Sequence, residues 1–119
     1  MTTILVVEDD IAIVDFLRTF LEEEGYKIMV AHNGEEGLAC LASARPALVL
    51  SDLMMPVLNG QELYKRMQAD PRYKSIPFVL MSAVRTALNQ KDSHYAAVVA
   101  KPFELNDLID TVERLIPNK

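Results

Sequence analysis

The stretch ILVVEDD at residues 4–10 joins four consecutive apolar residues to three consecutive acidic ones. A short apolar run with polar residues on both sides is typical of a strand that is buried on both faces of a sheet. The apolar residues that follow, from Ile13 to Leu21, recur with the spacing of one helix face. The stretch therefore predicts a buried strand whose carboxyl end carries acidic side chains into the start of a helix.

The same succession of apolar strand and helix continues along the chain. Beside the strand at 4–7, strands are predicted at 27–31, 47–50, 78–81 and 96–100, and further helices at 33–43, 61–69 and 105–115. Most of these strands are continuous apolar runs, which is the pattern of parallel strands covered by helices on both faces. We therefore expect an α/β protein with a doubly wound, five-stranded parallel sheet, forming one domain over residues 1–119.

Composition excludes several other classes of protein. The chain has 119 residues, a formal net charge of −5 and a single cysteine, Cys40. No internal disulfide can form, and no apolar run approaches the length of a membrane span or of a signal-peptide core. Lysine and arginine form no basic run, so direct binding of nucleic acid is not expected. These features predict a cytoplasmic protein with no membrane association.

Polar residues follow four of the five predicted strands. In a doubly wound sheet, functional groups collect beyond the carboxyl ends of the strands, so these side chains are expected to share one pocket. They are Glu8, Asp9 and Asp10 after the first strand, Asp52 after the third, Ser82 after the fourth and Lys101 after the fifth.

A cluster of carboxylates predicts a bound divalent cation, because the carboxylates repel one another and Mg²⁺ prefers oxygen ligands. A carboxylate such as Asp52 can also act as a nucleophile that accepts a phosphoryl group. Lys101 and Ser82 could then stabilise the remaining phosphoryl oxygens. We expect Asp10 to act differently, as the N-cap of the first helix.

At this point the chain resembles the receiver domain of bacterial response regulators, over essentially its full length. The resemblance rests on four motifs in order, which are ILVVEDD at 4–10, ALVLSDLMMPVLNG at 47–60, PFVLMSA at 77–83 and KPF at 101–103. It implies the flavodoxin-like strand order 2-1-3-4-5.

The resemblance also implies a role for each site residue. Asp52 corresponds to the phosphoacceptor, and Ser82 and Lys101 to the hydroxyl and ammonium that contact the phosphoryl group. The Lys101-Pro102 bond corresponds to a cis peptide. The implied Mg²⁺ ligands are Asp9 directly, Glu8 directly or through water, Asp52, and the backbone carbonyl of Met54; the Met54 side chain is expected to pack.

The implied activity is that of a phosphoacceptor switch that assists its own phosphorylation and dephosphorylation, not that of a classical enzyme. The donor would be a phosphohistidine on a sensor histidine kinase or a histidine phosphotransfer protein. Because no effector sequence follows residue 116, we expect a stand-alone receiver that acts by binding a protein target, whose identity the sequence does not give.

The chain departs from the family at two places. Val98 stands where the family often has a switch tyrosine or phenylalanine, and the stretch between Ser82 and Lys101 is about three residues shorter than expected. We therefore expect residues 84–94 to be a mobile output segment.

Two other function classes fit the sequence less well. A flavin-binding electron carrier would need a phosphate-binding loop after the first strand, where the acidic run would repel the phosphate. An aspartyl phosphatase would need a general acid near Asp52, commonly two residues on, where Met54 stands.

Overall fold

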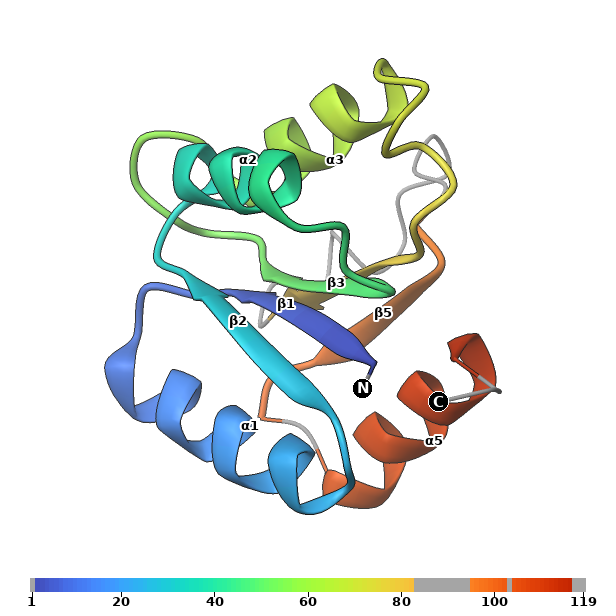
Figure 1. The fold of residues 1–119 in the computed structure, drawn as a ribbon. Coiled ribbons are helices and arrows are strands. Elements are labelled where there is room, and N and C mark those ends of the chain that lie inside the picture. Colours follow the sequence, from blue (N-terminus) through green and yellow to red (C-terminus); the bar gives the residue numbers. More distant parts are fainter. Residues whose placement is uncertain (1, 83–94, 103, 117–119) are drawn as a thin grey trace.

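The computed structural model describes residues 2–82, 95–102 and 104–116. Its centre is a five-stranded sheet in the order β2-β1-β3-β4-β5, with every neighbouring pair parallel (Figure 1). This confirms the expected fold class and strand order. The strands are β1 (Thr3–Val7), β2 (Lys27–Ala31), β3 (Leu48–Asp52), β4 (Phe78–Ser82) and β5 (Ala97–Ala100).

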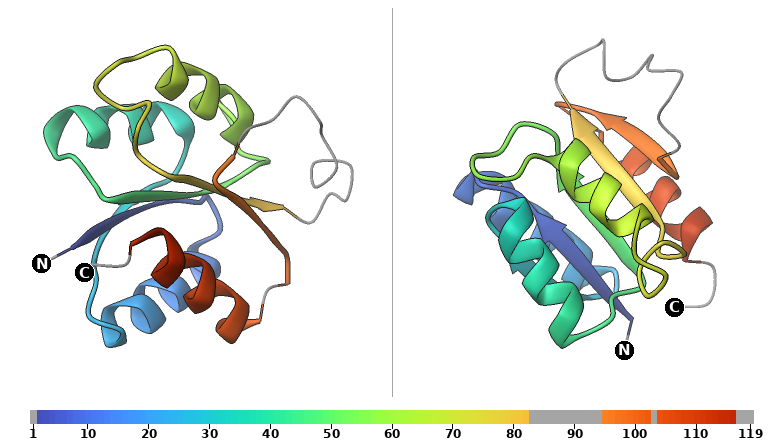
Figure 2. Two further views of the ribbon diagram at one scale, coloured as in Figure 1. Left: turned by 90° about the vertical axis from the view of Figure 1, so that its right-hand side faces the viewer. Right: turned by 90° about the horizontal axis from the view of Figure 1, so that it is seen from above.

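Helices cover both faces of the sheet. Helices α1 (Ile11–Glu23) and α5 (Leu105–Leu115) lie on one face, and α2 (Gly34–Ser43) and α3 (Gly60–Gln68) lie on the other (Figures 1 and 2). Strand residues alternate between the two cores because successive side chains point to opposite faces. In β1, Ile4 and Val6 pack in the α1 and α5 core, whereas Leu5 and Val7 pack in the α2 and α3 core.

Side-chain caps set the starts of three helices. Asp10 accepts hydrogen bonds from the backbone N–H groups of Ala12 and Ile13, so its predicted role as the N-cap of α1 is confirmed. Asn33 accepts a hydrogen bond from the backbone N–H of Glu36 and caps α2, which begins at Gly34. At α3, Asn59 and Glu62 form a capping box. The helix predicted at 61–69 therefore begins one residue earlier, at Gly60, after an Asn-x-x-Glu pattern that is typical of such a box.

Three large apolar side chains, two of which were expected to pack, are exposed. The spacing of α1 placed Phe16 on its inner face, but the side chain is 46% exposed; Leu105, the first residue of α5, is 39% exposed. The prediction that Met54 packs is also wrong, because this residue is 67% exposed. Helical spacing identified an apolar face without showing how far the neighbouring elements extend over it.

The predicted output segment at 84–94 lies outside the described residues. The described residues next to it include Tyr95, whose ring contacts Tyr64 and Phe78 at centroid distances of 4.6 and 5.8 Å. Val98 is half-buried against the same core.

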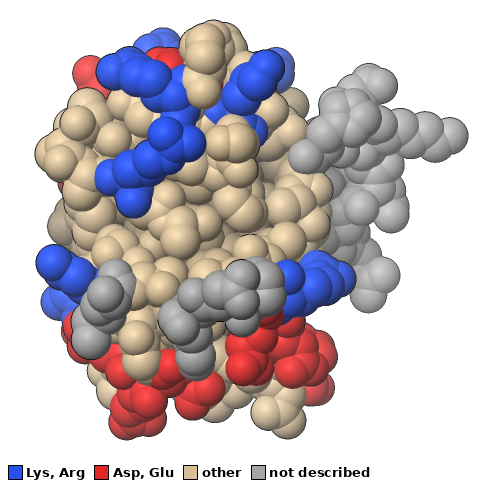
Figure 3. Space-filling model, turned by 45° about the vertical axis from the view of Figure 1, so that its right-hand side comes forward, with Lys and Arg blue, Asp and Glu red and all other residues tan. Residues whose placement is uncertain are grey.

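In the view of Figure 3, acidic side chains gather at one end of the molecule, whereas basic side chains gather at the other end and also lie beside the acidic group. Helix α5 and its N-cap carry four exposed acidic residues, which are Glu104, Asp107, Asp110 and Glu113. Helix α3 and the turn after it carry the exposed residues Lys65, Arg66, Arg72 and Lys74. Folding thus gathers basic residues that form no run in the sequence.

Within the described part of the chain, no helix has the length and apolar character needed to cross a membrane.

Candidate functional site

The carboxyl ends of four strands meet at one edge of the sheet. Asp52 is the last residue of β3, and its register partner on β4 is Met81, one residue before the strand ends at Ser82. Glu8 directly follows β1, and Lys101 directly follows β5. Parallel pairing in register therefore brings together residues that are up to 93 positions apart in the chain.

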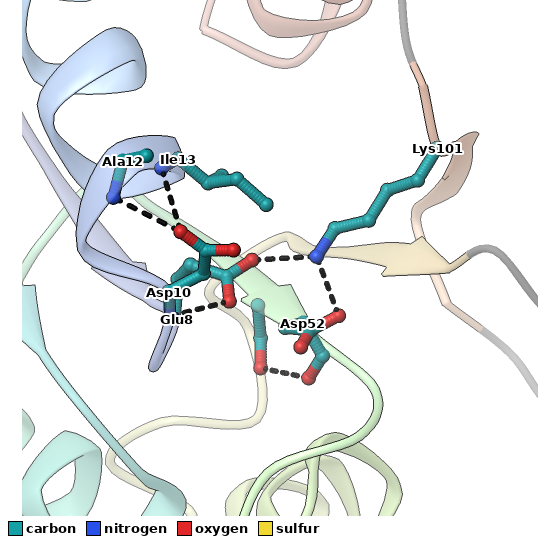
Figure 4. Close-up of polar contacts among 7 residues, drawn as sticks. Glu8, Asp10, Ala12, Ile13, Asp52 and Lys101 are labelled. Carbon is teal, nitrogen blue, oxygen red and sulfur yellow. Dashed lines mark hydrogen bonds and ion pairs between the residues drawn. The ribbon is translucent and has the colours of Figure 1, made fainter.

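Lys101 joins two buried carboxylates. Its ammonium nitrogen Nζ lies 2.6 Å from Glu8 Oε1 and 3.0 Å from Asp52 Oδ1 (Figure 4). The second carboxylate oxygen of Glu8 accepts a hydrogen bond from the backbone N–H of Asp10 at 3.0 Å. Glu8 and Asp52 are only 1% and 7% exposed. The ammonium therefore compensates negative charge that would otherwise be buried unpaired.

Burial and hydrogen bonding shift the pKa values of Glu8 and Lys101. Burial raises the pKa of Glu8 above its ordinary value and outweighs the hydrogen bonds from Lys101 and from the Asp10 N–H, while the nearby charge of Asp52 raises it further. Burial alone would lower the pKa of Lys101, but hydrogen bonds to Glu8 and Asp52 raise it. Lys101 therefore keeps its charge, and Glu8 takes up a proton more readily than an exposed glutamate.

Three carboxylates lie close enough together for one oxygen of each to bind the same metal ion. The ligand oxygens of Glu8, Asp9 and Asp52 all lie within 4.8 Å of one another. Asp9 is exposed, whereas the other two are buried. Asp10 turns toward the start of α1 and is occupied there as its cap. This all-oxygen donor set, open to solvent on the side of Asp9, fits a hard divalent cation that keeps part of its water shell.

The backbone around Asp52 is tightly constrained. Gly60 approaches so closely that a Cβ atom there would lie 2.3 Å from the carbonyl oxygen of Asp52. The same oxygen accepts a hydrogen bond from the hydroxyl of Ser51 at 2.9 Å, and the N–H of Gly60 donates to the carbonyl of Leu53. Neither the role of the Ser51 hydroxyl nor this contact was predicted from the sequence, because the close approach depends on how α3 returns to the end of β3.

The remaining predicted site residues lie nearby on the same edge. Ser82 is 2% exposed, and its carbonyl oxygen accepts a hydrogen bond from the N–H of Lys101 at 3.0 Å. The Lys101-Pro102 peptide is cis, as the resemblance implied. Met54 lies two residues beyond Asp52 in the loop that leads to α3.

Comparison with known proteins agrees with this geometry. The Response regulator receiver domain family matches residues 4–113. The response regulator SaeR from Staphylococcus aureus is 33% identical over 122 residues, which cover 98% of this chain and 51% of SaeR. The chain spans about half the length of the curated relatives it matches.

Solved structures give the same result. The signal receiver domain of a signal transduction histidine kinase from Syntrophus aciditrophicus superposes with a TM-score of 0.92 at 29% identity, covering 98% of this chain and 91% of that one. The response regulator TrrA from Thermotoga maritima, solved in complex with Mg²⁺ and BeF, superposes with a TM-score of 0.88 at 33% identity. The superposition covers 97% of this chain and 99% of TrrA. The chain therefore belongs to the response regulator receiver domain family of two-component signalling.

Proposed function

We propose that this receiver accepts a phosphoryl group on Asp52 from a phosphohistidine and thereby changes a surface that binds another protein. The observation that carries the proposal is the contact of Asp52 with Lys101 at 3.0 Å, beside the carboxylates of Glu8 and Asp9. This arrangement combines a carboxylate nucleophile, a fixed cation and ligands for a metal ion in one partly buried pocket.

The reaction needs little covalent chemistry from the chain. A carboxylate oxygen of Asp52 attacks phosphorus, and the bond from phosphorus to the donor histidine nitrogen breaks, so that an acyl phosphate forms and the histidine leaves. Lys101 is placed to contact a phosphoryl oxygen as charge shifts onto it. Ser82, at the end of the neighbouring strand, would contact a second oxygen through its hydroxyl.

A Mg²⁺ ion would be held by Asp9, Asp52, the backbone carbonyl of Met54 and, directly or through water, Glu8. When bound, it would neutralise charge on the phosphoryl oxygens. The Mg²⁺-bound structure of TrrA, a relative with 33% identity, supports this assignment. The ion pairs from Lys101 offset part of the repulsion between Glu8 and Asp52.

We further propose that the donor is a sensor histidine kinase or a histidine phosphotransfer protein, and that the exchange takes place in the cytoplasm. Membership of a two-component signalling family supports this choice of donor.

A mass measurement tests the proposed function. We expect the wild type, incubated with acetyl phosphate and Mg²⁺, to gain one phosphoryl group on Asp52. The Asp52→Asn variant should gain none, whereas Asp15→Asn, which changes an exposed carboxylate on α1 that is not one of the three converging carboxylates, should behave as the wild type. Labelling that persists in Asp52→Asn would overturn the assignment.

A further inference from the structure

One polar side chain interrupts an apolar row that crosses the whole sheet. The parallel register places one residue from each strand in this row, and its apolar members pack in the core beneath α2 and α3. From β2 to β5 the row is Ala31, Val7, Ser51, Leu80 and Val98. Ser51 is 0% exposed. A buried hydroxyl in apolar surroundings costs free energy unless it forms a hydrogen bond, so the bond that Ser51 makes indicates its role.

The Ser51 hydroxyl donates to the carbonyl oxygen of Asp52 at 2.9 Å. Neighbouring residues of a strand direct their backbone groups to opposite sides, and the N–H of Leu53 donates to the carbonyl of Met81 on β4. The carbonyl of Asp52 therefore points toward the β1 side. The register of β1 with β3 ends at the pair of Val7 and Ser51, one residue before Asp52. The Ser51 hydroxyl thus supplies a donor at the point where the pairing with β1 has ended.

We propose that Ser51 is a positioning residue that fixes the peptide between Asp52 and Leu53 and thereby orients the phosphoryl-transfer site. This inference rests on the proposed function and adds a residue that acts through the backbone. A peptide unit is planar, so holding its carbonyl oxygen fixes the orientation of the whole unit. The Asp52 carboxylate is attached on one side of this unit. The carbonyl of Met54, a proposed Mg²⁺ ligand, follows on the other side.

The surroundings leave this peptide few other ways to be held. Gly60 packs against the carbonyl of Asp52, and its N–H already donates to the carbonyl of Leu53 at 2.9 Å. Without the hydroxyl, the carbonyl of Asp52 loses a donor that Gly60 does not replace, and the peptide is free to rotate. Rotation would move the Asp52 carboxylate away from its 3.0 Å contact with Lys101. Displacements of about 1 Å at a reacting group can cost about 100-fold in rate.

Three variants separate positioning from stability. Ser51→Ala removes the hydroxyl, whereas Ser51→Thr keeps it. Ile76→Val is the matched control for stability, because it shortens a buried side chain and should lower the urea midpoint of unfolding. Ile76 lies two residues before the start of β4, whereas the pocket lies beyond the end of that strand.

Each protein is measured in three ways. The carbonyl ¹³C chemical shift of Asp52, recorded by NMR without Mg²⁺, reports the hydrogen bond itself. Calorimetric titration gives the Mg²⁺ affinity, and intact mass gives the rate of labelling by acetyl phosphate at saturating Mg²⁺. We expect Ser51→Ala to move the carbonyl shift upfield, to weaken Mg²⁺ binding about threefold and to slow labelling about tenfold. Ser51→Thr should stay within about twofold of the wild type in affinity and rate, and Ile76→Val should match the wild type in all three measurements.

Several results would overturn the proposal. These are an unchanged carbonyl shift or labelling rate in Ser51→Ala, an equal slowing in Ile76→Val, or a folded Ser51→Thr that is labelled as slowly as Ser51→Ala. A wild type that acetyl phosphate does not label on Asp52 would instead reject the proposed function. The carbonyl shift and the Mg²⁺ titration need no phosphorylation, so they would still decide whether Ser51 orients the site.

Discussion

Replacing Gly60 with alanine tests how closely the start of α3 controls the position of Asp52. A Cβ atom at residue 60 would lie 2.3 Å from the carbonyl oxygen of Asp52 and 3.1 Å from both the carbonyl carbon of Asp52 and the Cα of Leu53. Carbon atoms in contact prefer separations of about 3.5–4.0 Å. All three neighbours are backbone atoms, so no side-chain rotation relieves the overlap, and the end of β3 must move away from α3.

The expected loss of stability follows from two opposing effects. Alanine in place of glycine favours a helix by up to about 1 kcal/mol. Overpacking that forces a backbone shift costs typically about 1–3 kcal/mol, and the backbone contact here places the cost at the upper end. The net loss in the free energy of unfolding is therefore about 2 kcal/mol. This corresponds to roughly a 30-fold change in the ratio of folded to unfolded protein and to a fall in the urea midpoint of about 1 M.

The matched control is Gly37→Ala in α2. Gly37 is also buried and helical, but a Cβ atom there would meet only side-chain atoms at ordinary distances, the nearest being Val7 Cγ2 at 3.4 Å. We expect this variant to be as stable as the wild type or more stable by up to about 1 kcal/mol. Gly60→Ala should also be labelled by acetyl phosphate more slowly, by on the order of tenfold, because a small displacement of a reacting group is costly. A Gly60→Ala variant with the wild-type midpoint and labelling rate would refute the reasoning.

Three further predictions concern charged residues. Asp9→Ala should weaken Mg²⁺ binding, measured by calorimetric titration, more than Glu8→Gln does, because Glu8 is already engaged by Lys101; equal losses would contradict this. Lys101→Met should lower the free energy of unfolding at pH 7 by about 3 kcal/mol by leaving buried carboxylates unpaired, and added Mg²⁺ should recover part of the loss. Without the Lys101 ammonium the pKa of Glu8 rises further, so the loss in free energy of unfolding should become smaller as the pH falls and Glu8 is protonated. A loss that does not depend on pH would contradict the explanation that the unpaired charge of Glu8 causes it. Hydrogen bonds from the Arg72 side chain and backbone lower the pKa of Asp70 below its ordinary value of 3.8. The Asp70 carboxylate therefore stabilises the fold above that pH, and the urea midpoints of Asp70→Asn and the wild type should differ at pH 7 and converge as the pH falls below 3.8.

The elements of the fold were predictable because they follow from local patterns. Apolar runs of four or five residues identified the strands, and helical spacing identified the helices between them. The N-cap at Asp10 was also predictable, because a cap depends only on residues two or three positions away. The position of polar residues directly after strands indicated which side chains would share a pocket, since parallel strands end at a common edge.

Contacts between distant parts of the chain were decided only by the tertiary structure. The ion pair of Lys101 with Glu8 depends on the parallel pairing of β5 with β4, of β4 with β3 and of β3 with β1. Likewise, no local sequence pattern predicts that Gly60 packs on the carbonyl of Asp52.

The exposure of apolar side chains was predicted least accurately from the sequence. Phe16 and Met54 were expected to pack, yet both are exposed at the edge that holds Asp52. The sequence determined the strands, the helices and the chemical groups of the site, because these depend on residues close together in the chain. The tertiary structure decided which apolar residues remain exposed, because exposure depends on how far neighbouring elements extend. It also decided the strained turn at Val57, where φ is 69°, because that turn depends on how the loop between β3 and α3 closes.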